Sequence, residues 1–174
     1  MNLKSLILTC LTGAMAAAPL PAAVTVAPGA DSRIAVIFVQ PQNFTDVRRT
    51  YLGDTSVELL GEIQKFIRET GESSVPEGMK LQVRVTDIDL AGDFEPWRDS
   101  RLTDVRILRA IYPPRIKLEF QLTDRDGHVV RSGQRDLSDL AYQMRLTWPK
   151  DDYLRHEKDL LRDWYSTEFR GLKA

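Results

Sequence analysis

Cysteine is almost absent from this sequence, and its single copy lies near the N-terminus. Cys10 sits inside an uncharged run of apolar and small residues, Leu6 to Ala18, that follows Lys4. Residues 24–174 contain no cysteine. That part of the chain therefore forms no disulfide and offers no thiolate as a nucleophile or a metal ligand.

Histidine is scarce, and several short catalytic motifs are missing. The two histidines are His128 and His156, and Leu160 stands where a zinc protease of the zincin type would need a second histidine after His156-Glu157. We expect both histidines at the surface. The sequence has no G-x-S-x-G, no S-x-x-K and no glycine-rich phosphate loop. We therefore predict no cofactor and no bound metal.

Neither sign of charge is in excess, and long apolar runs are lacking. The chain has 24 lysines and arginines against 25 acidic residues, a net charge of -1. This balance gives no electrostatic reason to bind nucleic acid or an anionic membrane. No apolar run reaches the roughly 20 residues that a membrane-spanning helix needs. We expect no membrane span in the mature chain.

The N-terminal residues have the features of a secretory signal. Lys4 supplies the positive charge, Leu6 to Ala18 supplies the apolar segment, and Ala22 and Ala23 offer small residues for cleavage. Cys10 is too close to the positive segment to suit lipid attachment. We predict a signal peptide over residues 1–23, export to the periplasm, and a single domain over 24–174 that opens with a loose linker, 24–32.

Periodicity predicts the elements of the first half. The apolar run from Ile34 to Val39 is typical of a buried strand. Thr55 to Glu58 has the spacing of a capping box, and a helix with one apolar stripe should follow and stop at Gly71. The stripe consists of Leu59, Leu60, Ile63, Phe66 and Ile67. Residues 81–86 alternate as a strand does.

The second half predicts a short helix, a hairpin and a long helix. The short helix covers Asp104 to Ile111, and Ile116 to Thr123 is a one-sided strand that turns at Asp126-Gly127 and returns at Val129. Leu137 to Trp148 is ambiguous. Asp151 to Phe169 should form an amphipathic helix whose stripe includes Leu154, Leu161, Trp164, Tyr165 and Phe169. We predict an α+β fold: one mixed sheet of about four strands, two longer helices, a short helix and a long loop rich in acids and arginines.

Four carboxylates follow the strand that begins at residue 81, namely Asp87, Asp89, Asp93 and Glu95. If the alternation continues, the two aspartates of the Asp-x-Asp pair point into the core; otherwise a bulge resets the register. Inward carboxylates need partners, and the best cations nearby are Arg106, Arg109 and Arg115. We expect at least one of these arginines to bind Asp87 or Asp89.

Several of these segments together resemble a bacterial exported family catalogued as domain of unknown function 3016. The segments are Thr86 to Gly92, Val105 to Arg109, Tyr112 to Ile116, Leu137 to Tyr142 and Glu157-Lys158 with Trp164. The resemblance covers the whole of the predicted mature chain. It supports the predicted export and the single domain, and it brings no established activity, substrate or catalytic residue.

Two functions fit the sequence. The first is a non-catalytic module of the cell envelope that binds an envelope protein or a small ligand. The second is a periplasmic acid-cluster enzyme or metal-dependent hydrolase that uses Asp87, Asp89, Asp93 and Glu95, because paired carboxylates suit divalent cations and acid–base chemistry. We favour the first, since nearby arginines would compete with a metal. The candidate cluster, structural or functional, is Asp87, Asp89, Asp93, Glu95, Arg106, Arg109, Tyr112 and Arg115.

Overall fold

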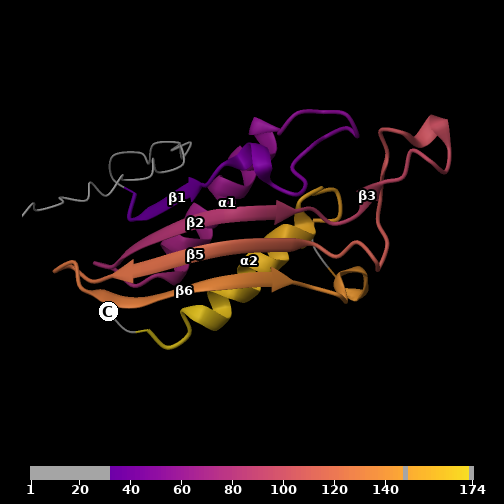
Figure 1. The fold of residues 1–174 in the computed structure, drawn as a ribbon. Helices are drawn as coiled ribbons and strands as arrows, with labels where there is room; N and C mark the ends of the chain where they lie inside the picture. The colour runs from indigo at the N-terminus through magenta and orange to yellow at the C-terminus, as the bar shows by residue number, and fades with distance from the viewer. Residues whose placement is uncertain (1–31, 147–148, 173–174) are drawn as a thin grey trace, which may run out of the picture.

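The fold is built on one mixed β-sheet whose four strands lie in the order β1-β2-β5-β6 (Figure 1). A computed structural model describes residues 32–146 and 149–172. The strands are β1 (Ile34–Phe38), β2 (Lys80–Asp89), β5 (Arg115–Thr123) and β6 (Val129–Ser138), and the two α-helices are α1 (Val57–Ser74) and α2 (Arg155–Glu168). The predicted α+β class, with a four-stranded mixed sheet and two longer helices, is confirmed.

Strand directions follow from the connections between the strands. β1 and β2 are parallel because α1 lies between them in the chain and returns it to the same end of the sheet. β2 with β5 and β5 with β6 are antiparallel pairs. The turn between β5 and β6 contains Asp126 and Gly127, and β6 begins at Val129, as the sequence predicts.

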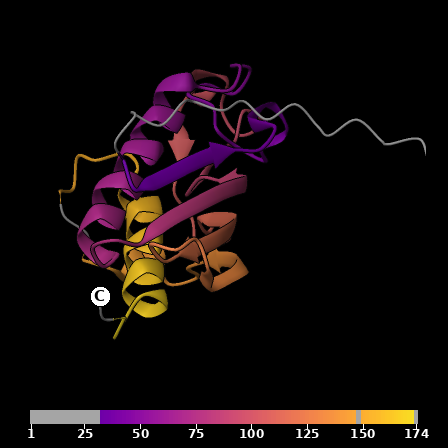
Figure 2. The same cartoon turned by 90° about the vertical axis from the view of Figure 1, so that its left-hand side faces the viewer.

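Both helices cover the same face of the sheet, as the view in Figure 2 shows. α1 packs against β1, α2 packs against β5 and β6, and the two helices contact each other. The predicted stripe of the C-terminal helix is buried: Leu154, Leu161, Trp164, Tyr165 and Phe169. The opposite face of the sheet carries polar side chains, among them Arg84 and Glu119, which form an ion pair at 3.5 Å.

Helix α1 begins and ends at residues other than those predicted. Its N-cap is Ser56, whose side-chain oxygen accepts a hydrogen bond from the N–H of Leu59 at 3.3 Å. The predicted capping box is therefore wrong, and Glu58 forms an ion pair with Arg49 instead. The helix also continues beyond Gly71 to Ser74.

Gly71 allows close packing and does not end the helix. A Cβ atom at this position would lie 2.9 Å from the hydroxyl oxygen of Tyr165 and 3.0 Å from two side-chain carbons of Ile34. The same hydroxyl donates a hydrogen bond to the carbonyl oxygen of Ile67 at 2.8 Å. The missing side chain thus lets α1 approach β1 and α2 closely.

Residues 92–112, called the arm below, extend beyond one end of the sheet (Figure 1). The N–H of Gly92 donates to the carbonyl of Tyr112 at 3.0 Å and closes the base of the arm. Inside it, two short strands pair antiparallel, β3 (Asp93–Phe94) and β4 (Arg106–Ile107), and a 3-10 turn covers Ser100–Leu102.

The short helix predicted for Asp104 to Ile111 is wrong. β4 occupies the middle of that segment, and Val105, Leu108 and Ile111 are exposed. Their spacing suits a helix, but the arm lies beyond the end of the sheet and has no core surface for a helical stripe to cover. Within this segment, Arg106 and Ile107 pair with β3 in an extended conformation.

The ambiguous stretch holds the end of β6 and a 3-10 turn, Tyr142–Met144, while Trp148 lies outside the described residues. α2 begins at Arg155, later than the predicted Asp151. Asp152 precedes the helix, where its carboxylate accepts the N–H of Leu154 at 2.9 Å.

The predicted signal peptide, residues 1–23, and the predicted linker up to residue 31 lie outside the described residues. Within residues 32–146 and 149–172, no helix is both long enough and apolar enough to cross a membrane.

Candidate functional site

A β-bulge decides where the carboxylates of β2 point. The register between β2 and β5 shifts between Val85 and Asp87, so Thr86 has no partner of its own in β5. Ile88 consequently occupies the buried face together with Val85, and both aspartates leave the core. Of the two arrangements that the sequence allows, the bulge is the one present.

Asp87 fastens the segment after β1 to the sheet. Its carboxylate accepts hydrogen bonds from the backbone N–H and the hydroxyl of Thr45, at 2.8 and 3.0 Å, and pairs with the ammonium group of Lys117 at 3.0 Å. Partial burial opposes ionisation, but the bonds from Thr45 and Lys117 outweigh it and hold the pKa of Asp87 below its ordinary value. Lys117 therefore supplies the cation that we expected from an arginine.

Asp89 is half-buried, and no hydrogen bond or ion pair reaches its side chain from the described part of the chain. Burial and the neighbouring carboxylates of Asp46, Asp87 and Asp93 raise its pKa from 3.8 to about 6, and Arg106 opposes the rise only in part. The expected pairing of Asp87 or Asp89 with Arg106, Arg109 or Arg115 is wrong for both aspartates.

Arg106 binds Asp46, a buried carboxylate that the sequence analysis missed. One terminal guanidinium nitrogen lies 2.5 Å from the carboxylate and 2.8 Å from the carbonyl of Gly92. The guanidinium also lies over the ring of Phe94, 4.5 Å from its centroid. These contacts join β4 of the arm to the segment that follows β1.

Glu95 is the centre of a second cluster, inside the arm. Its side chain is buried and accepts hydrogen bonds from Arg98 and from the hydroxyl of Tyr112, each at 3.1 Å. It also forms an ion pair with Arg109 at 3.3 Å. Asp93 bonds locally to the N–H of Phe94 at 2.7 Å. The cations neutralise the buried carboxylate and hold the turns of the arm together.

Arg115, the last of the candidates, forms no ion pair with Asp87, Asp89 or Glu95. It forms two hydrogen bonds of 2.7 Å with Asp136 of β6, on the exposed face of the sheet. Seven of the eight candidate residues thus divide among several structural contacts, and Asp89 makes none with the described residues.

A buried acid on α2 completes the anchoring of the arm. Glu157 is 1% exposed, and one of its carboxylate oxygens accepts the N–H of Ala91 at 2.7 Å, whereas the other has no hydrogen-bond partner. Burial raises the pKa of Glu157 from 4.5 to about 7. A sequence signal was present, because Glu157 lies between Leu154 and Leu161 on the apolar stripe of the helix.

His156 is buried, so the prediction of a surface position is wrong for it, whereas His128 is exposed as expected. The His156 imidazole packs edge-on against Tyr142, with ring centroids 4.8 Å apart, and burial lowers its pKa. The Tyr142 hydroxyl donates to the carbonyl of Arg109 at 2.8 Å. α2 and the 3-10 turn before it therefore hold both ends of the arm.

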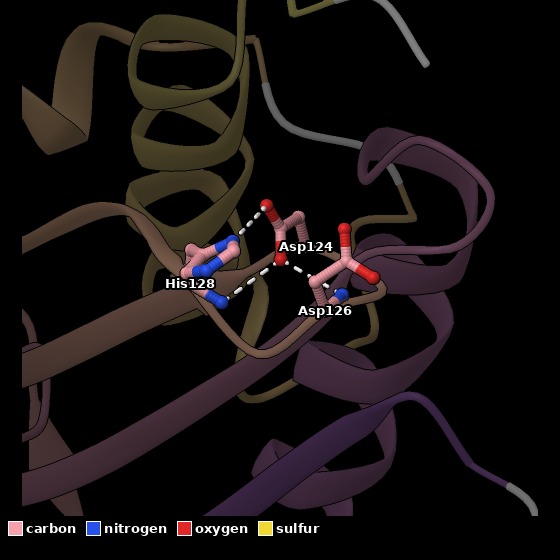
Figure 3. A group of neighbouring side chains, drawn as sticks. All are labelled: Asp124, Asp126 and His128. Carbon is pink, nitrogen blue, oxygen red and sulfur yellow. Dashed lines mark hydrogen bonds and ion pairs between the residues drawn. The ribbon is translucent and has the colours of Figure 1, made fainter.

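The turn between β5 and β6 brings Asp124, Asp126 and His128 together (Figure 3), with one potential ligand atom from each within 4.8 Å of the others. One oxygen of Asp124 accepts the backbone N–H groups of Asp126 and His128, each at 2.9 Å, and the other lies 3.3 Å from the imidazole. These bonds fully explain the cluster as the closure of an exposed turn.

Two carboxylates have pKa values near neutrality, Asp89 and Glu157, as general acid–base chemistry requires. Glu157, however, is sealed beneath Ala91, and Asp87, Asp93 and Glu95 already accept hydrogen bonds from the chain. Asp89 is thus the one acid of the predicted cluster that combines a raised pKa with no hydrogen bond from the described residues, while the other three acids make structural contacts.

A family model described as "Protein of unknown function (DUF3016)" matches residues 32–167. The chain belongs to this family. The DUF3016 match runs from just before β1 into the last turn of α2, so it includes the sheet, both helices and the arm. The resemblance to domain of unknown function 3016 is confirmed over these residues. No curated protein and no solved structure matches the chain.

Proposed function

We propose that this DUF3016 protein is exported to the periplasm and acts there as a non-catalytic binding module that docks an envelope protein through its arm. The proposal rests mainly on the apolar side chains that the arm exposes. Trp97 and Ile111 are both 69% exposed, and Leu102, Val105 and Leu108 are exposed as well. Apolar groups gathered on one projecting segment are typical of protein-binding surfaces, and tryptophan is among the residues that contribute most there.

The anchoring of the arm supports the same role. Glu95 and its cations lie inside the arm, Arg106 ties β4 to Asp46, and Glu157 holds the chain at Ala91. A segment fixed at this many points loses little conformational entropy when a partner binds. Such rigidity suits a docking surface better than it suits a mobile connection.

The alternative, an enzyme or metal-dependent hydrolase that uses the acid cluster, has less support. It needs carboxylate oxygens that converge on one open space. Asp87 is bound by Thr45 and Lys117, and Glu95 is bound by two arginines and a tyrosine. Two of the four acids of the cluster are thus already neutralised by cations of the chain.

Site-specific photo-crosslinking in intact cells tests the docking role. A photoreactive residue at position 97 or 111 should crosslink to one common protein, whereas the same residue at Leu52, an exposed apolar side chain outside the arm, should not. The purified partner should then bind the parent at least about tenfold more tightly than it binds the Trp97→Ala/Ile111→Ser variant. Equal binding to both, or crosslinks between two copies of this chain alone, would refute the proposal.

Export is tested separately by fractionation and intact-mass measurement. The protein should appear in the periplasmic fraction with a mass that corresponds to cleavage near Ala22 or Ala23, because the apolar segment is short and small residues follow it. A product that retains Met1, or one that stays in the membrane after salt and carbonate washing, would contradict the predicted signal peptide.

A further inference from the structure

A cavity of about 250 Å³ lies between the start of α1, the end of β2 and the segment before α2. Leu59 of α1, Leu90 and Ala91 after β2, and Tyr153 before α2 give it an apolar lining. Three arginines also line it, Arg48, Arg49 and Arg106. The cavity thus combines apolar walls with cationic groups from two distant parts of the chain, the combination that recognises an anion with an apolar body.

The three guanidinium groups are held differently. Arg106 is fixed by Asp46 and Gly92, and Arg48 donates to the carbonyl of Tyr51 at 3.2 Å and lies 3.7 Å from Asp46. Arg49 forms an ion pair with Glu58, and the side chains of that pair are 57% and 73% exposed. An exposed ion pair of this kind contributes little, so a ligand can displace Glu58 at small cost.

The described lining of the cavity carries three guanidinium groups and no acid. The carboxylates of Asp46 and Glu58 pair with these arginines, and Asp89, whose pKa is raised to about 6, lies near Arg106. Burial raises the pKa of Glu157, beneath Ala91, to about 7, so this acid adds only part of a negative charge near neutral pH. Leu59 belongs to the first turn of α1, whose N-terminal end adds a partial positive charge.

We infer that this cavity binds a small organic anion, with its carboxylate against Arg48 and Arg49 and its apolar group against Leu59 and Leu90. Arg106, held by Asp46, is a positioning residue that keeps the base of the arm at the edge of the cavity. When the ligand binds, the ion pair between Arg49 and Glu58 breaks, and the Arg49 guanidinium binds the carboxylate of the ligand. Tyr153, whose ring lies 5.7 Å from the Arg49 guanidinium, covers the apolar group. This inference does not rest on the docking role of the arm, because Trp97 and Ile111 do not line the cavity.

NMR titration of the purified, isotope-labelled protein tests the inference, with hexanoate as the probe. Hexanoate should shift the backbone amide signals of Leu59 and Ala91 in a saturable manner, and hexanol and inorganic phosphate should bind at least about tenfold more weakly. Hexanol keeps the apolar chain of the probe but lacks its charge, whereas phosphate is charged but lacks the apolar chain. Equal binding of hexanol would refute anion recognition, and equal binding of phosphate would refute the apolar contact.

Two variants and a matched control test whether Arg49 is the cation that binds the hexanoate carboxylate. Arg49→Gln should weaken hexanoate binding about tenfold, and Glu58→Gln should strengthen it, because it removes the group that competes for Arg49. Arg84→Gln removes an arginine of a similar exposed ion pair on the open face of the sheet and should change nothing. The inference fails if hexanoate does not bind at millimolar concentration, if Arg49→Gln and Arg84→Gln have equal effects, or if Glu58→Gln weakens binding.

Discussion

Glu157 combines nearly complete burial with one carboxylate oxygen that has no hydrogen-bond partner. Burial raises its pKa from 4.5 in the unfolded chain to about 7 in the folded protein, despite the opposing bond from Ala91 and the charges of Arg106 and Arg155. The folded state therefore holds the proton more tightly. The contribution of Glu157 to stability is fully present below a pH of about 4.5 and is lost as the pH rises through about 7.

We predict that Glu157→Gln removes this pH dependence, since glutamine resembles the protonated acid and can still accept the N–H of Ala91. The variant should be more stable than the parent by about 1 to 3 kcal/mol at pH of about 8 and equal to it at pH of about 4. Urea unfolding of both proteins at the two pH values measures the difference. A difference of the same size at both would show that the pKa of Glu157 is not raised.

The aspartates near Arg106 should respond in opposite ways to amide substitution. Asp46→Asn leaves Arg106 without its buried partner and should cost about 3 kcal/mol of stability. Asp89→Asn removes a charge that Asp46, Asp87 and Asp93 repel, so it should leave the protein as stable as the parent or more so at neutral pH. Thermal unfolding of the two variants decides the matter, and an equal loss in both would mean that Arg106 serves Asp89 as well.

At the scale of a single helix, two glycines of α1 provide a matched test of packing. Gly71→Ala places a Cβ within 3.0 Å of Tyr165 and Ile34 and should cost about 1 to 3 kcal/mol through overpacking. Gly61→Ala meets nothing within 4 Å and should stabilise the protein by about 0.5 to 1 kcal/mol, because alanine favours a helix. Chemical denaturation measures both, and stabilisation by Gly71→Ala would contradict the close contact of α1 with β1 and α2.

The elements that were predicted correctly are those whose side chains meet the core. Ile116, Leu118 and Phe120 alternate because every second residue of β5 faces the helices, and the stripe of α2 repeats because one side of that helix faces the sheet. The long loop rich in acids and arginines was also predicted, but its internal structure was not, because the arm lies beyond the sheet and exposes Val105 and Ile111.

Sequence alone could not choose the partners of the acidic residues. The bulge at Thr86 and an inward pair of aspartates fit the same residue types, and only the pairing with β5 distinguishes them. Lys117 reaches Asp87 because the two lie opposite each other in neighbouring strands, although they are far apart in the chain. For Glu95, the sequence predicted only a loop rich in acids and arginines. It did not predict that Arg98 and Arg109 are the residues that pair with this acid.

At the scale of the whole molecule, the tight packing of α2 makes it an integral layer of the domain. The ring of Trp164 lies 5.6 Å from that of Phe120 in β5 and 5.5 Å from that of Phe169, measured between centroids. Trp164→Ala should cost about 3 to 5 kcal/mol and lower the unfolding midpoint in a single cooperative transition.

Trp97→Ala is the matched control, because that side chain is 69% exposed and its loss should leave the midpoint nearly unchanged. Calorimetry with a second optical probe of unfolding checks both variants. Two separate transitions, or a shorter chain that ends near Pro149 and unfolds at the parental midpoint, would mean that α2 is an appendage.

The arm also bears on how proteins of this fold can diverge. β2 and β5 are antiparallel neighbours, which usually need about two to five residues between them, yet residues 90–114 make this connection. The entropy of closing such a loop grows only with the logarithm of its length, so the sheet tolerates the insertion without depending on it. As long as Ala91, Glu95 and Arg106 keep the contacts described above, exposed side chains of the outer arm such as Trp97 and Leu102 can change. One scaffold can in this way acquire new specificities through changes in a single loop.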